Sequence, residues 1–300
     1  MDVLDTYEWA TARLDDGRLT FDTPDGFERA LADGFFFVRK PVGFDLTAGD
    51  RFAANFYLDH NGGEDDEYRG FRAWGASRLA EREGYYCRDA DQVEQFFLDA
   101  RFWKKVFPAA LSRQAREMRD FSVAVVRAIL GRLDLPREIL ERATGGVLSG
   151  RGTYHLTFNH FRPHIRARGL NIHKDSGWIT MLRSLERGLE VRRGRQWLPI
   201  VPRPDAFIMN FGCAIEILTK DTHTPVAAVA HRVVEQQARP EGVPDRFSYA
   251  LFVDSSLDTA QCEGLYRFDP QAGLVLAADF NTFLDKILAN TYDRDTEGLY

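Results

Sequence analysis

Two histidines and an aspartate constrain this chain more than any other feature of its sequence. His173 and Asp175 form a His-x-Asp element, and a third candidate ligand, His231, lies far downstream. In an extended strand, residues i and i+2 point to the same face, so His173 and Asp175 can reach one metal ion together. Two imidazoles and one carboxylate make the facial triad that holds non-haem Fe(II) and leaves coordination positions open. The spacing therefore predicts a fold in which a distant strand carries His231 alongside.

The segments around these ligands have the composition of β-strands. Taken alone, the His-x-Asp tripeptide is also compatible with a surface loop, but runs rich in β-branched and aromatic residues lie on both sides of it. A hairpin with a glycine-containing turn is expected next, because two such runs are separated by Gly194. Together the expected strands occupy residues 169–172, 177–182, 188–200, 205–212, 215–218 and 246–253.

Six short motifs occur in the order and approximate spacing seen in one enzyme family: His173-x-Asp175, Gly188-Leu189-Glu190-Val191, Trp197-Leu198-Pro199, Asn210-Phe211-Gly212, His231-Arg232-Val233 and Arg246-x-Ser248. From about Leu156 to Ser256, the chain resembles the iron- and 2-oxoglutarate-dependent oxygenases of the isopenicillin N synthase-like family. The resemblance implies a mainly β fold with flanking α-helices, namely a double-stranded β-helix of the jelly-roll or cupin-like type. It also implies Fe(II), O2 and the cosubstrate 2-oxoglutarate.

The same resemblance suggests how the chain is organised. We expect a single oxygenase domain over 1–300, with the barrel core at 154–256. A mostly helical N-terminal region, 1–150, would pack on the barrel, and apolar residues at helical spacing predict a long helix over 109–133. Residues 257–300 would contain a C-terminal helix, and the tail is either a lid over the active site or a frayed end.

A second set of residues is expected to bind the cosubstrate. Arg246 and Ser248 lie two apart on an expected strand, so their side chains share a face. A guanidinium pairs with a carboxylate through two parallel bonds, and the resemblance implies that this pair grips 2-oxoglutarate. Outside that context, Arg246 would be a strand residue in a surface ion pair. Asn159 matches a family asparagine near the cosubstrate, although Phe161 replaces a common tyrosine; Asn159 could instead satisfy a backbone group.

A third set is a candidate for binding the primary substrate. The segment Arg82-x-Gly84-Tyr85-Tyr86 resembles a segment of isopenicillin N synthase that helps bind a peptide with a free carboxylate. The resemblance makes Arg82 and Tyr86 candidate substrate residues, and it favours an amino-acid-derived or carboxylate-bearing small molecule. A surface turn with packed aromatic rings is an equally good interpretation. Other histidines before the triad, His155, His160 and His164, are expected to be structural or solvent-facing.

Composition excludes several other classes of protein. The net charge of -6 provides no basic surface for nucleic acid. No apolar run approaches the length of a membrane span, and the first residues lack a secretory signal pattern. Three dispersed cysteines do not indicate a disulfide framework or a zinc site. We therefore expect a cytoplasmic protein with no nucleic-acid or membrane partner.

The predicted function is that of an Fe(II)/2-oxoglutarate-dependent dioxygenase that oxidises a C–H bond of a small molecule. Hydroxylation, desaturation and ring formation all remain open, within specialised metabolite biosynthesis such as that of antibiotics. Two alternatives also remain. An oxidase of the isopenicillin N synthase type would use Fe(II) and O2 without 2-oxoglutarate, and a non-catalytic binding protein on this fold would lack iron affinity. Zinc accepts the same ligand types, so the residues alone do not select the metal.

Overall fold

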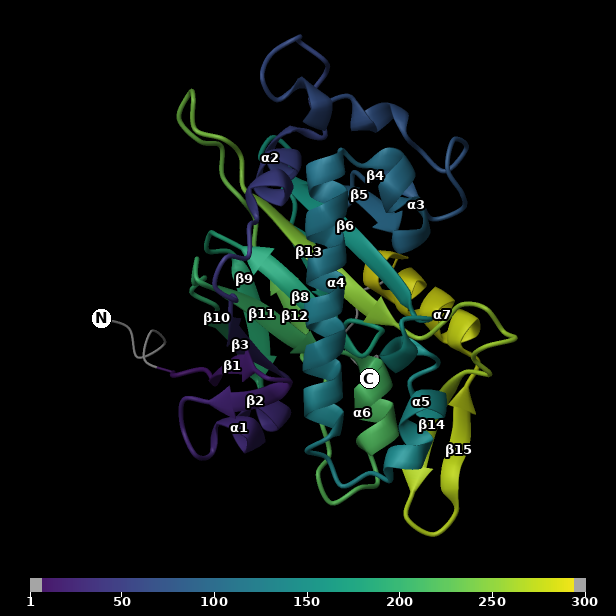
Figure 1. Ribbon diagram of the computed structural model, residues 1–300. Helices are drawn as coiled ribbons and strands as arrows, with labels where there is room; N and C mark the ends of the chain where they lie inside the picture. Colours follow the sequence, from purple (N-terminus) through teal and green to yellow (C-terminus); the bar gives the residue numbers. More distant parts are fainter. Residues whose placement is uncertain (1–6, 294–300) are drawn as a thin grey trace.

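Two β-sheets face each other at the centre of the molecule (Figure 1). The computed structural model describes residues 7–293, with side chains described up to residue 287. The large sheet contains β1 (Thr11–Asp15), β2 (Arg18–Phe21), β3 (Phe35–Arg39), β4 (Gly84–Cys87), β5 (Val93–Asp99), β6 (Thr153–Phe161), β8 (Ile179–Ser184), β11 (Ala206–Phe211) and β13 (Phe247–Asp254), in the order β2-β1-β3-β11-β8-β13-β6-β5-β4. The small sheet contains β7 (Leu170–His173), β9 (Leu189–Arg193), β10 (Gln196–Pro199) and β12 (His231–Val233), in the order β10-β9-β12-β7.

Helices and a separate hairpin flank these sheets. The helices are α1 (Gly26–Asp33), α2 (Thr47–Asn55), α3 (Ala100–Val106), α4 (Ala109–Leu130), α5 (Leu140–Ala143), α6 (Cys213–Thr219) and α7 (Phe280–Asp293). Short 3₁₀ turns lie at η2 (Asp66–Tyr68), η3 (Phe71–Ala73), η4 (Arg137–Ile139) and η5 (Val147–Ser149). The hairpin of β14 (Leu265–Asp269) and β15 (Gly273–Ala278) precedes α7. Within residues 7–293, no helix is both long and apolar enough to cross a membrane.

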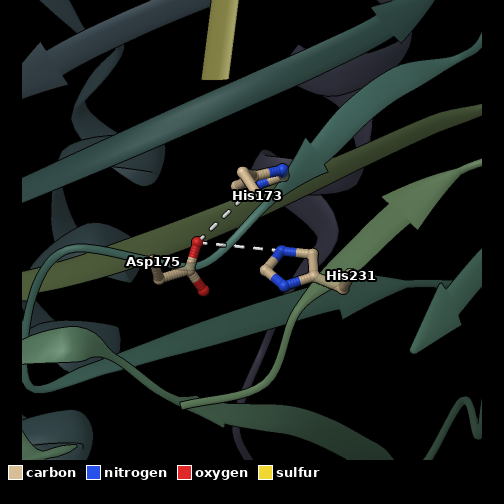
Figure 2. Close-up of side chains that lie close together, drawn as sticks. All are labelled: His173, Asp175 and His231. Atoms are coloured by element: carbon tan, nitrogen blue, oxygen red, sulfur yellow. Dashed lines mark ion pairs between the residues drawn. The ribbon is translucent and has the colours of Figure 1, made fainter. Parts of the chain in front are cut away.

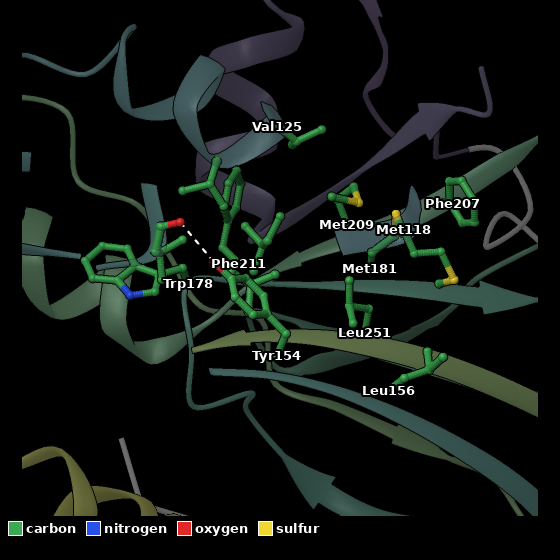
Figure 3. Close-up of a cluster of buried hydrophobic side chains, with 14 of the residues drawn as sticks. Met118, Val125, Tyr154, Leu156, Trp178, Met181, Phe207, Met209, Phe211 and Leu251 are labelled. Atoms are coloured by element: carbon green, nitrogen blue, oxygen red, sulfur yellow. Dashed lines mark hydrogen bonds between the residues drawn. The ribbon is translucent and has the colours of Figure 1, made fainter. Parts of the chain in front are cut away.

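The two faces of the large sheet differ in polarity because side chains alternate along each strand. On the outer face, apolar residues such as Leu156, Met181 and Met209 join one buried cluster with Met118 and Val125 of α4 (Figure 3). The predicted apolar stripe of the long helix over 109–133 therefore packs on the sheet as expected.

The inner face, which looks toward the small sheet, is apolar at one end and polar at the other. Phe37 of β3 and Ile208 of β11 share a second apolar cluster with Leu189, Val191 and Val233 of the small sheet. Farther along the large sheet, β6 turns His155, Thr157 and Asn159 to this inner face, while its alternate residues pack outward. Functional side chains are therefore concentrated at the polar end.

Most expected elements are present, and the expected strand at 215–218 is wrong. Residues Cys213–Thr219 form α6 instead. After Gly212, the backbone N–H groups of Cys213 and Ala214 donate to the carbonyls of Asp175 and Ser176, which turns the chain into a helix. A short apolar run does not distinguish a strand from one turn of buried helix by periodicity alone.

The N-terminal region contributes more strand than we expected from the sequence. Residues 1–150 were expected to be mostly helical, whereas they contain β1 to β5. β3 pairs with β11 and β5 pairs with β6, so this region extends the large sheet at both edges as well as supplying helices that pack on it. The expected C-terminal helix is α7, which contacts β7; the final residues, 294–300, lie outside the described part.

Candidate metal centre

The three predicted ligands meet between the two sheets (Figure 2). His173 ends β7 and is in register with His231 of β12, so the distant strand lies where the sequence pattern requires it. Asp175 Oδ1 lies 3.7 Å from Nε2 of His173 and 3.7 Å from Nε2 of His231. All three candidate ligand atoms lie within 4.8 Å of one another, which is close enough to hold one metal ion.

Backbone carbonyl groups orient both imidazoles. Nδ1 of His173 lies 2.9 Å from the carbonyl oxygen of Asn171, and Nδ1 of His231 lies 3.1 Å from that of Val229. A carbonyl can only accept, so each Nδ1 must carry the proton and each Nε2 lone pair turns toward Asp175. Ligating histidines commonly use such an outer partner to select the tautomer.

The electrostatic surroundings keep His173 in its ligating form. Burial lowers the pKa of His173 to about 4, with the neighbouring His231 adding to the effect and Asp175 opposing it. The imidazole is therefore neutral at pH 7, which is the form that binds a metal. Asp175 is buried, and its second oxygen accepts a hydrogen bond from the Asn210 side-chain amide at 3.2 Å.

Several of the matched motifs support this centre rather than contact it. Asn210 holds the Asp175 carboxylate, and Gly212 passes so close to the carbonyl of Gly177 that an added Cβ would lie 2.2 Å from its oxygen. On the small sheet, Arg232 next to His231 pairs with Glu190 at 2.7 Å and lies over the ring of Trp197. These contacts explain why the motifs occur together.

Arg246 is a buried cation whose hydrogen bonds within the protein are incomplete. Its side chain is 2% exposed, with Nε donating to the carbonyl of Arg187 at 3.1 Å and Nη2 to Ser184 Oγ at 3.4 Å. Nη1 has no hydrogen-bond partner among the described residues. Burial lowers the pKa of Arg246 to about 10, with Glu186 opposing the shift, so the guanidinium stays charged at neutral pH. A buried charge with an unused donor is suited to an incoming anion.

The other expected cosubstrate residues are neighbours in the sheet. Ser248 of β13 is in register with Asn159 of β6 and with Ser184 of β8. The Asn159 amide nitrogen lies 3.4 Å from Ser248 Oγ, and its oxygen accepts from Gln95 Nε2 at 2.7 Å. The Asn159 side chain therefore contacts other side chains of the inner face, and its role in binding the cosubstrate stays a prediction.

The two expected substrate residues, Arg82 and Tyr86, are more exposed than the candidate metal ligands. Arg82 adopts a positive φ of 66°, and its exposed guanidinium pairs with Asp285 of α7. Tyr86 is 51% exposed. The structure does not bring either side chain to the three metal-ligand candidates, so their role in binding substrate stays a prediction.

One buried cluster was missed by the sequence analysis. Glu83, Asp99 and His155 come together on the inner face and could also hold a cation. His155 was expected to be structural or solvent-facing, and it is 7% exposed. No local pattern could have revealed the group, because its members come from three separate segments and meet only through strand pairing.

Comparisons with known proteins agree with this geometry. The family model described as the 2OG-Fe(II) oxygenase superfamily matches residues 152–255. Codeine O-demethylase of Papaver somniferum is 34% identical over 113 residues, which are 36% of this chain and 29% of that protein. Jasmonate-induced oxygenase 2 of Arabidopsis thaliana is 30% identical over 154 residues, 49% of this chain and 38% of that protein. The chain thus spans about a third of the length of these relatives.

Solved structures extend the likeness beyond the barrel. The structure of JOX2 in complex with 2OG, Fe and JA aligns with a TM-score of 0.56 at 24% identity, covering 77% of this chain and 71% of that one. The dioxygenase for auxin oxidation in rice aligns with a TM-score of 0.62 at 20% identity, covering 97% and 98%. These alignments identify the fold as a double-stranded β-helix. The family match adds that residues 152–255 are similar to the 2OG-Fe(II) oxygenase superfamily.

Proposed function

We propose that this protein is an Fe(II)/2-oxoglutarate-dependent dioxygenase that oxidises a C–H bond of a small molecule. The observation that carries the proposal is the pairing of an oriented His-Asp-His cluster with the fully buried Arg246, whose Nη1 has no protein partner in the described part of the chain. A structural arginine in that position would be expected to have its donors satisfied.

The donor groups fit the two molecules that the family uses. Two imidazole Nε2 atoms and one carboxylate suit a divalent iron ion, with His173, Asp175 and His231 as its holders. The guanidinium of Arg246, with Ser248 nearby, suits a carboxylate of 2-oxoglutarate. When bound, iron and 2-oxoglutarate would supply the oxidising power by using O2 and releasing succinate and carbon dioxide.

The chain's own contribution is orientation and the exclusion of water. The Asn171 and Val229 carbonyls fix the two imidazoles, and Asn210 fixes the carboxylate between them. Phe161 lies 4.4 Å below the Arg246 guanidinium and covers one side of it. Gly188 leaves room on the edge of the guanidinium, since an added Cβ there would lie 3.2 Å from Arg246 Nε. These contacts hold the reacting groups in place before any ligand arrives.

The test measures 2-oxoglutarate consumption and oxygen uptake by the purified protein, and the proposal expects oxygen uptake to require 2-oxoglutarate. Arg246→Gln should raise the Michaelis constant for 2-oxoglutarate by about 10- to 100-fold, because one charge-assisted pair is lost. The matched control is Arg192→Gln, which removes an exposed arginine of β9 and should leave that constant unchanged. Oxygen uptake that needs no 2-oxoacid would contradict the proposal and support the oxidase alternative.

The nature of the primary substrate is a separate proposal. Relatives named for codeine and for jasmonate support a small molecule, and Arg82 and Tyr86 are proposed to lie at its entrance. The pairing of Arg82 with Asp285 of α7, a helix that contacts β7, supports this position. Arg82→Ala should weaken substrate binding while iron content stays unchanged; an unaltered substrate affinity would remove the support for a carboxylate-bearing substrate. A role in specialised metabolism is proposed from the same relatives, and a cytoplasmic location remains the prediction made from the sequence.

A further inference from the structure

The inner face of the large sheet carries a second cluster of titratable side chains. His155 Nε2 lies 3.3 Å from Glu83 Oε1 and 3.8 Å from Asp99 Oδ2. The three residues are only 5%, 4% and 7% exposed, in the order Glu83, Asp99 and His155. None of them belongs to the candidate metal centre or to the Arg246 site.

Strand register explains how the cluster forms. Asp99 ends β5 directly opposite His155 of β6, so both side chains lie on the inner face. Glu83 immediately precedes β4 and reaches over the end of the sheet, where its Oε2 accepts the Asp99 backbone N–H at 2.8 Å. One oxygen of Glu83 and one of Asp99 remain directed at the imidazole.

The cluster has more buried negative charge than buried positive charge. Two carboxylates share a single imidazole, and buried carboxylates are costly unless cations or donors balance them. Arg101 donates to the other Asp99 oxygen at 2.8 Å, but its side chain is 69% exposed and lies at the outside. An additional cation on the inner side would therefore be stabilised there.

The neighbouring inner-face residues would lie beside a ligand bound at this point. Phe97 and Phe252 are only partly buried, although both lie inside the barrel by strand register. The Phe97 ring stacks on the His155 ring with centroids 4.2 Å apart. Thr157, two residues along β6 from His155, is 2% exposed, and its hydroxyl has no hydrogen-bond partner in the described part of the chain. That hydroxyl is available to a polar group of a bound molecule, and it is an observation independent of the charged cluster.

The cluster also lies within reach of the metal centre. Asp254 is in register with Thr153, two residues before His155 on the same face. Its carboxylate accepts a hydrogen bond from Ser176 Oγ at 3.1 Å, and Ser176 directly follows the candidate ligand Asp175. A small molecule that extends along β6 could therefore contact both regions.

A second metal ion is the less suitable occupant. In the candidate metal centre a carbonyl takes each Nδ1 proton, whereas the hydrogen bonds found among residues 7–293 give His155 Nδ1 no such acceptor. Nothing therefore directs a lone pair from Nε2 toward a metal. Partly exposed phenyl rings beside carboxylates suit an organic cation, which gains both ion pairing and contact with ring faces.

We propose that Glu83, Asp99 and His155 form a subsite for a positively charged nitrogen of the primary substrate, an ammonium group. Phe97 and Phe252 would contact the adjoining carbon atoms, and the Thr157 hydroxyl would accept from or donate to a nearby polar group. Only the identification of the bound molecule as the substrate rests on the proposed oxygenase function. The binding of an ammonium group does not.

The test compares 2-phenylethylamine with its neutral analogue 2-phenylethanol. Binding of each to the protein loaded with Fe(II) and 2-oxoglutarate is measured by calorimetry without oxygen. The amine should bind at least about ten-fold more tightly, the ratio expected for one hydrogen bond to a charged group. Glu83→Gln and Asp99→Asn should each remove most of that preference, since both keep an acceptor of similar shape but lose the charge.

Controls separate this inference from loss of folding and from the oxygenase proposal. Glu81→Gln changes an exposed neighbouring carboxylate and should keep the wild-type preference. Melting curves identify a variant that fails to fold, in which case the other variant decides. His173→Ala should lose iron yet keep the preference for the amine. Equal binding of the two probes, no binding of the amine, or a second iron equivalent that disappears in Glu83→Gln would each overturn the inference. Absent succinate formation with an intact amine preference would overturn only the oxygenase function.

Discussion

Two buried clusters on the inner side of the barrel contain the same types of side chain but differ in their surroundings. Around Asp175, two imidazoles face one carboxylate, and carbonyl groups accept their outer protons. Around His155, one imidazole faces two carboxylates. The first arrangement leaves neutral lone pairs for a metal, and the second leaves negative charge for a cation. Residue type and burial are shared, so partner groups and charge balance must distinguish the two sites.

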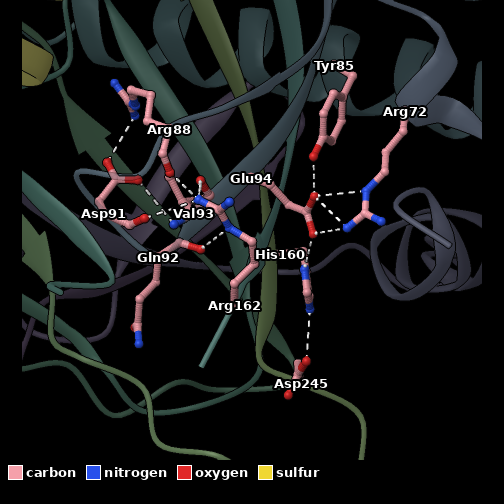
Figure 4. A network of polar contacts seen from close by, with 10 residues as sticks. All are labelled: Arg72, Tyr85, Arg88, Asp91, Gln92, Val93, Glu94, His160, Arg162 and Asp245. Carbon is pink, nitrogen blue, oxygen red and sulfur yellow. Dashed lines mark hydrogen bonds and ion pairs between the residues drawn. The ribbon is translucent and has the colours of Figure 1, made fainter. Parts of the chain in front are cut away.

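A third histidine shows the same motif with its charge already balanced. His160 lies between Glu94 and Asp245, with Nδ1 2.7 Å from the first and Nε2 3.1 Å from the second (Figure 4). Arg72 donates to Glu94 at 3.0 Å, and the Tyr85 hydroxyl donates to it as well. These contacts join Glu94 of β5 and His160 of β6 to Arg72 and Asp245, which lie outside the sheet.

The largest difference between the clusters should appear in iron binding. Asp175→Ala removes a proposed ligand, so the loss of iron affinity should exceed the roughly 10- to 100-fold cost of losing an outer partner. Asp99→Ala should leave one iron per chain. Metal analysis after dialysis measures both. If the two variants lost iron equally, the distinction between the clusters would not hold.

The balanced network should contribute most to stability. Burial disfavours the Glu94 carboxylate, but hydrogen bonds from His160, Tyr85 and Arg72 outweigh burial and lower its pKa to about 2. Relative to an ordinary glutamate, this shift corresponds to roughly 3 kcal/mol of folding free energy. A lowered pKa stabilises the fold above about pH 4.5, and the contribution disappears as the pH falls toward 2.

Glu94→Gln should therefore lower the free energy of unfolding by up to about 3 kcal/mol at pH 7, with the difference from wild type shrinking below about pH 4.5. Glu83→Gln should lower the free energy of unfolding by less than Glu94→Gln does. The reason is that the wild-type Glu83 cluster contains unbalanced negative charge, which the substitution reduces. Urea unfolding at several pH values provides the measurement. A larger loss for Glu83→Gln at neutral pH would show that its cluster is the structural one.

The smallest effect is expected from an outer residue of the metal centre. Asn210→Ala removes the donor to Asp175 Oδ2 while leaving all three candidate ligands in place. Iron affinity should fall by about ten-fold, the lower end of the range for such partners. Asn61→Ala, at an exposed loop, is a suitable control. Unchanged affinity would mean that the carbonyl groups alone orient the site.

The sequence predicted those features whose residues lie close together in the chain or occur in known motifs, and it did not predict contacts that form only when distant strands pair. The His173-x-Asp175 pair needs only the two-residue repeat of a strand, and His231 and Arg246 were placed by motifs in a fixed order. The strand expected at 215–218 failed because Ile215 and Leu218 suit a buried helix turn equally well. Glu83 and Asp99 had no signal at all, since β4 and β5 bring them to His155 only when the large sheet assembles.

The register of His173 with His231 has a mechanical consequence. β7 is a four-residue edge strand that, among residues 7–293, pairs only with β12, and its last residue is His173. An ion held by both histidines and Asp175 would cross-link this edge strand to its neighbour β12. Because α7 contacts β7, this cross-link would also stabilise the position of the C-terminal helix. Slowed hydrogen–deuterium exchange in β7 on adding Fe(II) would report metal occupancy without any turnover.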